Sequence, residues 1–196
     1  MGTVEERADE ELMGLLCQGI DDALAVLVRR YQNDVFRFCL HYLKNVEQAK
    51  ESAQETFLRI YTARKRFDVS RKFKPWMLCI ARNLCLNELK RKKPVGMETL
   101  EDYASSARED SGALVESPVD GPAELLMASE RRRLLMAALE RLPDEAQEII
   151  KLRFFERLPA REIAEIIEST EGAVRTRLHR LLRQLRDECA HLREEV

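Results

Sequence analysis

Apolar residues recur every three to four positions along most of this 196-residue chain. This spacing places them on one side of an α-helix, which turns by roughly 100° per residue. Alternation of apolar and polar residues, the pattern of a half-buried β-strand, never extends beyond a few positions. The sequence therefore predicts an all-α protein, with helices over residues 12–20, 23–43, 49–61, 75–89, 125–142, 146–155 and 161–167 and a last one that begins at Ser169 or Thr170.

The helical periodicity is interrupted between Pro94 and Pro122. This segment contains three prolines, three glycines and several serines, which disfavour a continuous helix. Its net charge is −6, compared with +5 for residues 1–93 and −1 for residues 123–196. We therefore predict two small helical domains, 1–93 and 123–196, joined by a flexible acidic linker over residues 94–122.

The composition excludes several classes of protein. Hydrophobic residues make up 45% of the chain, which is enough for buried cores and argues against wholesale disorder. No stretch has the length and apolarity of a membrane helix, and the acidic start MGTVEERADEEL lacks the pattern of a signal peptide. The five cysteines include no CxxC pair, and the three histidines have no metal-ligand spacing. We expect a cytoplasmic protein that is not an enzyme and uses no metal or other cofactor.

The segment ERLPAREIAEIIESTEGAVRTRLHRLLRQL combines a short predicted helix, a tight turn and a longer basic helix. The apolar side of the longer helix consists of Val174, Leu178, Leu181, Leu182 and Leu185. This arrangement is typical of a helix-turn-helix, whose second helix enters the major groove and contacts bases near its start. The candidates for base contacts are Arg175, Thr176, His179 and Arg180. The candidates for contacts with phosphates or acidic neighbours are Arg177, Arg183 and Arg186.

A second basic segment lies before the linker. Residues 59–93 contain twelve basic and two acidic residues, interleaved with aromatic residues. Positive charge follows phosphates and aromatic rings stack on unpaired bases, so this composition suits a single-stranded nucleic acid. Phe57, Tyr61 and Trp76 also fit the core of a helical bundle, and we favour that role for them. Phe73 and the loop FDVSRKFKP are better candidates for exposed stacking, because a loop between helices need not bury its rings.

A helix for duplex DNA and a surface for an unpaired strand are both needed in transcription initiation. The sequence resembles that of an extracytoplasmic-function (ECF, group 4) sigma factor, the smallest class of bacterial RNA polymerase specificity subunit. QETFLRIY and FKPWMLCIARNLCLNELKRKK resemble the family's second region, and LERLPDEAQEIIKLRFFERLPAREIAEIIESTEGAVRTRLHRLLRQLR resembles its fourth. The resemblance implies that residues 1–93 bind core polymerase and recognise and melt the −10 element, and that residues 123–196 recognise the −35 element.

The resemblance also implies roles for individual residues. The positions that match the family's docking site on the clamp helices of the polymerase's largest subunit are Glu51, Gln54 and Glu55. The segment that captures a flipped, non-template base of the −10 element matches the loop 67–74, with Phe67, Ser70, Arg71, Phe73 and Lys74. Asn83 matches a residue beside that strand. The surface that meets the −35 element matches Arg175, Thr176, Arg177, His179 and Arg180.

The same resemblance implies the partners. They are core RNA polymerase, promoter DNA as duplex and as non-template single strand, and an anti-sigma factor, with no insertion into a membrane. The acidic linker is expected to pass through the polymerase channel that RNA later uses, where its negative charge mimics nucleic acid.

Two other classes of function remain as alternatives. A stand-alone helix-turn-helix regulator would bind duplex DNA without polymerase, which accounts for residues 123–196 but leaves QETFLRIY and the basic segment without a role. An enzyme is disfavoured because no phosphate-binding loop, nucleophile elbow or carboxylate pair stands out. Co-purification with core polymerase separates a sigma factor from a regulator.

Overall fold

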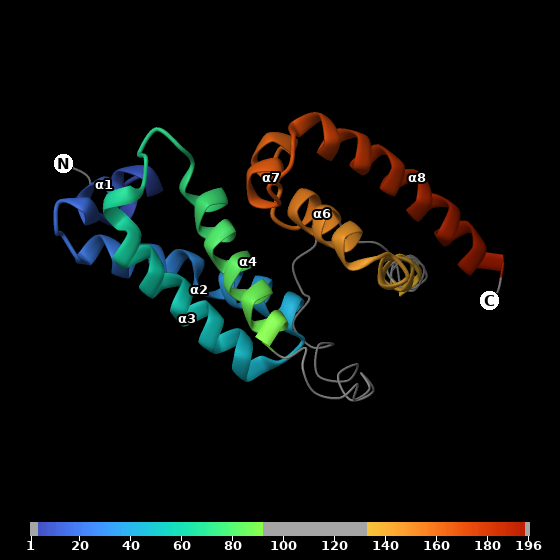
Figure 1. The fold of residues 1–196 in the computed structure, drawn as a ribbon, viewed down its shortest axis with the longest axis horizontal. Helices are drawn as coiled ribbons and strands as arrows, with labels where there is room; N and C mark the ends of the chain where they lie inside the picture. Colours follow the sequence, from blue (N-terminus) through green and yellow to red (C-terminus); the bar gives the residue numbers. More distant parts are fainter. Residues whose placement is uncertain (1–3, 92–132, 195–196) are drawn as a thin grey trace, which may run out of the picture. The chain divides into compact units, whose positions relative to one another are not determined.

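The computed structural model describes residues 4–91 and 133–194 (Figure 1). The fold is all-α, as predicted, and every regular element within these two ranges is a helix. The chain divides into two compact units, Met1–Leu100 and Glu101–Val196. No helix in the described ranges is both long and apolar enough to cross a lipid bilayer. The predicted linker 94–122 and the domain boundaries at its ends lie outside the described residues, as does the first part of the helix predicted over 125–142.

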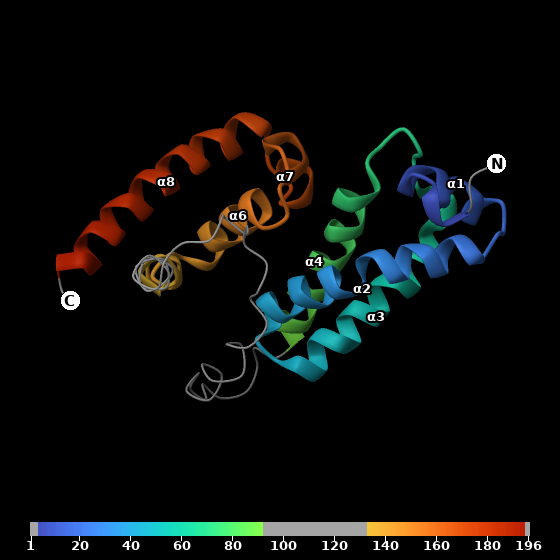
Figure 2. The ribbon, with the colours of Figure 1, turned by 180° about the vertical axis from the view of Figure 1, so that it is seen from behind.

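The amino-terminal unit is built around one long helix, α2 (Asp22–Leu43). It packs against α1 (Asp9–Cys17), α3 (Val46–Ala63) and α4 (Phe73–Arg91), and α3 also packs against α4. The short 3-10 helices η1 (Val4–Glu6) and η2 (Arg64–Arg66) lie against α2 and α1 respectively. Views from opposite sides show α2 and α3 side by side (Figure 1, Figure 2).

The turn between α2 and α3 has a local cause. Lys44 adopts a φ of 52°, a left-handed conformation that ends α2, and its N–H donates a hydrogen bond to the Leu40 carbonyl. Asn45 then caps α3, because its side-chain oxygen accepts a hydrogen bond from the Gln48 N–H at 3.0 Å. The helix therefore begins three residues before position 49, where its buried apolar face starts.

The first helix is shorter than its apolar pattern predicts. α1 ends at Cys17, and Gly19 adopts a φ of 90°, which glycine accommodates more readily than other residues. Ile20, which we predicted on the apolar side of this helix, follows that turn and is exposed. The prediction is wrong at this end because the backbone turn at Gly19 overrides the periodicity.

The core of the amino-terminal unit contains most of the apolar residues that the periodicity selects. Among the fully buried side chains are Leu12, Leu16, Leu27, Val35, Ile60, Phe73 and Met77. Phe57 is buried, and Tyr61 and Trp76 are partly buried, which agrees with the core role favoured for these three aromatic residues.

The carboxy-terminal unit is a second, smaller bundle. Residues 133–140 are helical, and α6 (Asp144–Phe154), α7 (Ala160–Ile166) and α8 (Glu171–Glu194) follow. Pro143 separates the first two of these helices, and Asp144 and Glu145 occupy the first turn of α6, where carboxylates favour the positive helix end. The core cluster consists of Ala138, Leu139, Leu142, Ile149, Ile150, Leu181 and Leu185.

One residue of α8 lies on a different side from the one predicted. Val174, Leu181 and Leu185 are buried and Leu178 is partly buried, but Leu182 is exposed. The buried residues follow one another at intervals of three and four positions. Leu182 lies roughly 100° around the helix from Leu181, which places it outside this stripe.

Candidate nucleic-acid interface

α7 and α8 form a helix-turn-helix. The conformation of the turn determines where α7 ends and where α8 begins. Glu168 adopts a φ of 54°, and the Ser169 N–H donates to the Ala164 carbonyl at 2.9 Å, which closes α7. The Thr170 hydroxyl then accepts a hydrogen bond from the Ala173 N–H at 3.2 Å. Of the two residues predicted to begin this helix, Thr170 is therefore the one that caps α8.

The polar residues at the start of α8 gather on one surface. Arg175, Thr176, His179 and Arg180 are all exposed and together line one surface depression, and we call these four residues the recognition surface. Arg177 is also exposed but does not line the depression. The reason is geometric, because position 177 points to another side of the helix than position 175.

Within the recognition surface, Arg175 has an internal partner. Its Nη2 lies 2.5 Å from Glu171 Oε1, one helical turn earlier, and both side chains are largely exposed. An exposed ion pair of this kind contributes at most about 1 kcal/mol. The pair therefore orients the guanidinium, and separating it costs little free energy.

The loop before α4 differs from the prediction in where its aromatic rings lie. Phe73 has 0% and Phe67 has 8% of its surface exposed. The Phe73 ring centroid lies 5.5 Å from that of Tyr31, and the Phe67 centroid lies 4.9 Å from that of Trp76. We call Tyr31, Phe67, Phe73 and Trp76 the aromatic cluster. The expectation that Phe67 and Phe73 offer exposed stacking surfaces is wrong, because burying these rings against other rings is more favourable than leaving them in water.

The middle of the 67–74 loop is exposed and ordered by a local turn. The Ser70 N–H donates to Asp68 Oδ1 at 2.9 Å, and the Arg71 N–H donates to the Asp68 carbonyl at 2.9 Å. The hydrogen bond from the Ser70 backbone holds the pKa of Asp68 below its usual value. Ser70 and Arg71 are exposed, and Lys74 is partly buried in the first turn of α4. The loop therefore presents backbone groups, polar side chains and the Val69 side chain rather than aromatic rings.

Asn83 lies further along α4 and is exposed. Its Nδ2 is 3.8 Å from the Cys79 sulfur within the same helix, so this weak contact does not connect it to the 67–74 loop. The amide therefore remains available to a partner that runs along α4.

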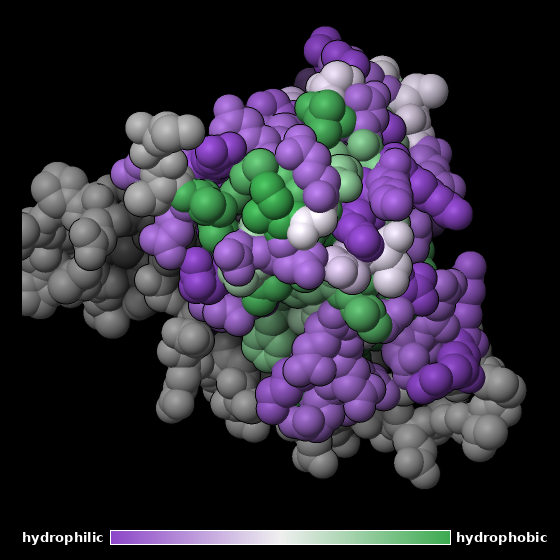
Figure 3. Space-filling model, turned by 90° about the vertical axis from the view of Figure 1, so that its left-hand side faces the viewer, coloured by the Kyte–Doolittle hydropathy of each residue, from purple (hydrophilic) through white to green (hydrophobic). Residues whose placement is uncertain are grey.

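The predicted polymerase-contacting residues share one side of α3. Glu51 and Gln54 are exposed, and the carboxylate of the partly exposed Glu55 lies 2.9 Å from Arg59 Nε. One turn further, Leu58 lies on the same side with 57% of its surface exposed. We call Glu51, Gln54, Glu55 and Leu58 the docking face. Figure 3 shows that apolar patches interrupt the mostly hydrophilic surface of this unit.

Comparison with known proteins assigns both units. Residues 27–95 match the family model Sigma-70 region 2, and residues 132–185 match the model Sigma-70, region 4. The chain is 32% identical over 182 residues to the ECF RNA polymerase sigma factor SigW of Bacillus subtilis (strain 168), an alignment that covers 87% of this chain and 92% of that protein. This chain belongs to the ECF sigma factor family.

Further relatives agree with this assignment. The ECF RNA polymerase sigma-E factor of Haemophilus influenzae is 30% identical over 178 residues, which cover 90% of this sigma factor and 92% of that one. The structure of CnrH in complex with the cytosolic domain of CnrY matches with a TM-score of 0.64 at 20% identity, over 97% of this chain and 100% of CnrH. At that identity the likeness concerns the fold.

In this sigma factor the region 2 match includes α3 and α4, and therefore the docking face, the 67–74 loop and Asn83. The region 4 match includes the helix-turn-helix and the recognition surface. Leu58 is not among the residues that the resemblance matches to the polymerase. Its position seven residues after Glu51, on a side of α3 that otherwise carries polar residues, predicts its exposure.

Proposed function

We propose that this sigma factor binds core RNA polymerase through the docking face and directs it to promoters that carry a −35 and a −10 element. The recognition surface meets the −35 element in the major groove. The exposed part of the 67–74 loop and Asn83 hold the unpaired non-template strand of the −10 element. The observation that carries this proposal is the presence of regions 2 and 4 in one chain, each with an exposed polar surface.

The same proposal includes a cytoplasmic location, no catalysis by the chain itself, and an anti-sigma partner. CnrH, which has the same fold, was solved in complex with the cytosolic domain of CnrY. A protein that covers the docking face or the recognition surface would keep this sigma factor from polymerase or DNA. The passage of the acidic linker through the RNA channel, and the domain boundaries 1–93, 94–122 and 123–196, remain predictions.

A stand-alone helix-turn-helix regulator is not favoured. Such a protein needs only the carboxy-terminal unit, whereas residues 27–95 match region 2 of sigma factors.

Run-off transcription tests the proposed function. Purified core polymerase is combined with the full chain on a library of genomic promoters, and the starts of the transcripts are sequenced. We expect transcripts only when the chain is present, with shared sequence elements near −35 and −10. A chain that neither co-purifies with core polymerase nor directs any transcript would refute the proposal.

The variant Arg175→Ala is expected to reduce discrimination at the −35 element. Loss of a base contact costs about 1–3 kcal/mol on the preferred sequence and little on an altered one. Two duplexes are compared, one with the preferred −35 sequence and one with an altered −35 sequence. The affinity of the reconstituted holoenzyme for each duplex measures the discrimination. Arg183→Ala is the matched control, since an exposed phosphate-contacting arginine on the same helix should weaken binding to both duplexes equally. Equal losses for Arg175→Ala on both duplexes would identify Arg175 as a phosphate contact instead.

The variant Asn83→Ala is expected to impair promoter opening more than the initial binding of duplex DNA. A lost hydrogen bond of about 1.4 kcal/mol corresponds to a roughly tenfold lower ratio of open to closed complex. Permanganate reactivity of unpaired thymines measures opening, and a mobility-shift assay at low temperature measures duplex binding. Asn87→Ala, an exposed asparagine one turn later on α4, serves as the control. Equal effects of the two variants would contradict the role of Asn83.

A further inference from the structure

We propose that Glu10, on α1, is a positioning residue that holds the 67–74 loop in the conformation used for strand capture. This inference rests on the function proposed above for the loop. It assigns a role in promoter opening to a helix that precedes residue 27, where the region 2 match begins.

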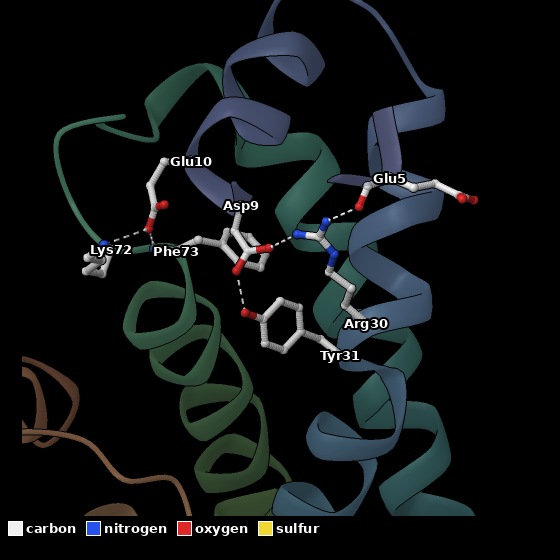
Figure 4. Close-up of polar contacts among 7 residues, drawn as sticks. All are labelled: Glu5, Asp9, Glu10, Arg30, Tyr31, Lys72 and Phe73. Atoms are coloured by element: carbon white, nitrogen blue, oxygen red, sulfur yellow. Dashed lines mark hydrogen bonds and ion pairs between the residues drawn. The ribbon is translucent and has the colours of Figure 1, made fainter. Parts of the chain in front are cut away.

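The first observation is a hydrogen bond across the fold. Glu10 Oε1 accepts a hydrogen bond from the backbone N–H of Phe73 at 3.1 Å, and the two residues are 63 positions apart in the sequence (Figure 4). Phe73 is the first residue of α4, where the backbone N–H has no partner within the helix. The same carboxylate oxygen lies 3.8 Å from Lys72 Nζ. Glu10 thus caps α4 from a different helix and contacts Lys72, the residue that precedes α4.

The second observation is that both ends of the loop are fixed while its middle is exposed. The Phe67 and Phe73 side chains are buried in the aromatic cluster, with their ring centroids 6.3 Å apart. Between them, residues 68–72 are all exposed, and Val69 exposes 55% of its surface. This arrangement presents a short segment to solvent from two anchored ends. At the Phe73 end, the hydrogen bond from the Phe73 N–H to Glu10 adds a polar contact to the burial of the ring.

The third observation is that α1 is itself held rigidly. Asp9, the neighbour of Glu10, accepts hydrogen bonds from the Tyr31 hydroxyl and from Arg30 Nη1, the latter at 2.6 Å (Figure 4). Arg30 Nη2 in turn donates to the Glu5 carbonyl. Burial and the hydrogen bond to Asp9 raise the pKa of the Tyr31 hydroxyl above its usual value. The ring of Tyr31 also packs on Phe73, so α2 supports both α1 and the loop anchor.

Together these contacts give Glu10 a functional consequence beyond stability. A loop that is already ordered loses less conformational entropy when it binds a strand, and this lowers the free-energy cost of capture. Loss of the Glu10 contact should therefore slow strand capture and leave duplex recognition by α8 unchanged. A residue with a merely structural role would instead affect stability, core binding and opening together.

The experiment uses two readouts on the full chain. Hydrogen–deuterium exchange of the sigma factor alone reports on the Phe73 amide and the 67–74 loop. Promoter opening is measured in the holoenzyme with permanganate, alongside duplex binding. The test variants are Glu10→Ala and the closer isostere Glu10→Gln, and Glu11→Ala is the control, since Glu11 is an exposed acid at the next position. Because the bond has a charged acceptor, we expect Glu10→Ala to speed exchange at Phe73 about tenfold or more.

The proposal holds if Glu10→Ala speeds loop exchange and lowers the open-to-closed ratio severalfold, if Glu10→Gln does so to a smaller degree, and if Glu11→Ala changes neither. Unchanged loop exchange in Glu10→Ala would overturn it. So would faster exchange with normal opening.

A loop variant separates failure of this inference from failure of the proposed function. Arg71→Ala changes the exposed part of the loop and leaves Glu10, Lys72 and Phe73 in place. If Arg71→Ala impairs opening and Glu10→Ala does not, the function of the loop stands and the role of Glu10 is wrong. If neither variant affects opening, the loop does not capture the strand, and both proposals fail at this site.

Discussion

Replacing Phe73 with alanine is expected to lower the free energy of unfolding of the amino-terminal unit by about 3–5 kcal/mol. Phe73 is fully buried, and its ring contacts Tyr31, Phe67 and Trp76, so the substitution removes apolar contacts and leaves a cavity that the surrounding helices fill only in part. Urea denaturation followed by the fluorescence of Trp76 measures this change. Trp76 is the only tryptophan of the chain, and its ring centroid lies 6.3 Å from that of Phe73, so the signal reports on this unit.

Val69→Ala is the matched control for this prediction. Val69 belongs to the same loop but exposes 55% of its surface, so its truncation should change the free energy of unfolding by no more than about 0.5 kcal/mol. A Phe73→Ala variant with stability close to that of Val69→Ala would show that the ring is not part of the core. Such a result would instead support the prediction from the sequence that Phe73 is an exposed stacking residue.

The second large effect is expected for charge reversal on the docking face. Glu55→Lys should weaken binding to core polymerase by about tenfold to a hundredfold, because a lysine meets a surface complementary to carboxylates. The fold should remain intact, since Glu55 makes only an exposed ion pair with Arg59. The like charges that replace this pair cost about 0.2–0.5 kcal/mol. Titration of labelled full-length chain with core polymerase measures the affinity, and circular dichroism monitors the fold.

Asp34→Lys provides the control for Glu55→Lys. Asp34 makes the same kind of local ion pair, with Arg37 at 2.5 Å, but it lies on α2. Both Asp34→Lys and Glu55→Lys replace a carboxylate with an ammonium group, so the change in charge is the same. If both reversals weaken core binding equally, the effect reflects overall charge, and the docking face does not include Glu55.

Much of the fold follows from local sequence. The spacing of apolar residues and the scarcity of alternating patterns predict the helices, and α2, α6, α7 and α8 lie close to their predicted ranges. Local chemistry also places the helix-turn-helix, because the short helix, the capping threonine and the basic helix are adjacent in sequence. The candidate residues of the recognition surface could be selected for the same reason. Position on a helix determines which residues share a side.

The predicted burial or exposure of a side chain is wrong where it depends on segments that are distant in the sequence. Periodicity cannot tell whether a leucine at the edge of an apolar stripe is covered, so it assigns Leu182 to the buried side of α8, whereas Leu182 is exposed. Loop position suggested exposure for Phe67 and Phe73, but partners on α2 and α4 bury them.

The sequence alone determined that this protein is helical, that it has two basic segments on either side of an acidic one, and which helix carries the candidate recognition residues. These properties depend on neighbours within a few positions. Only the tertiary structure decided that Glu10 caps α4 and that the loop is anchored by buried rings rather than offering them to DNA. The physical reason is distance along the chain. Burial and capping depend on groups that folding brings together from tens of residues apart, and nothing in the local pattern identifies them.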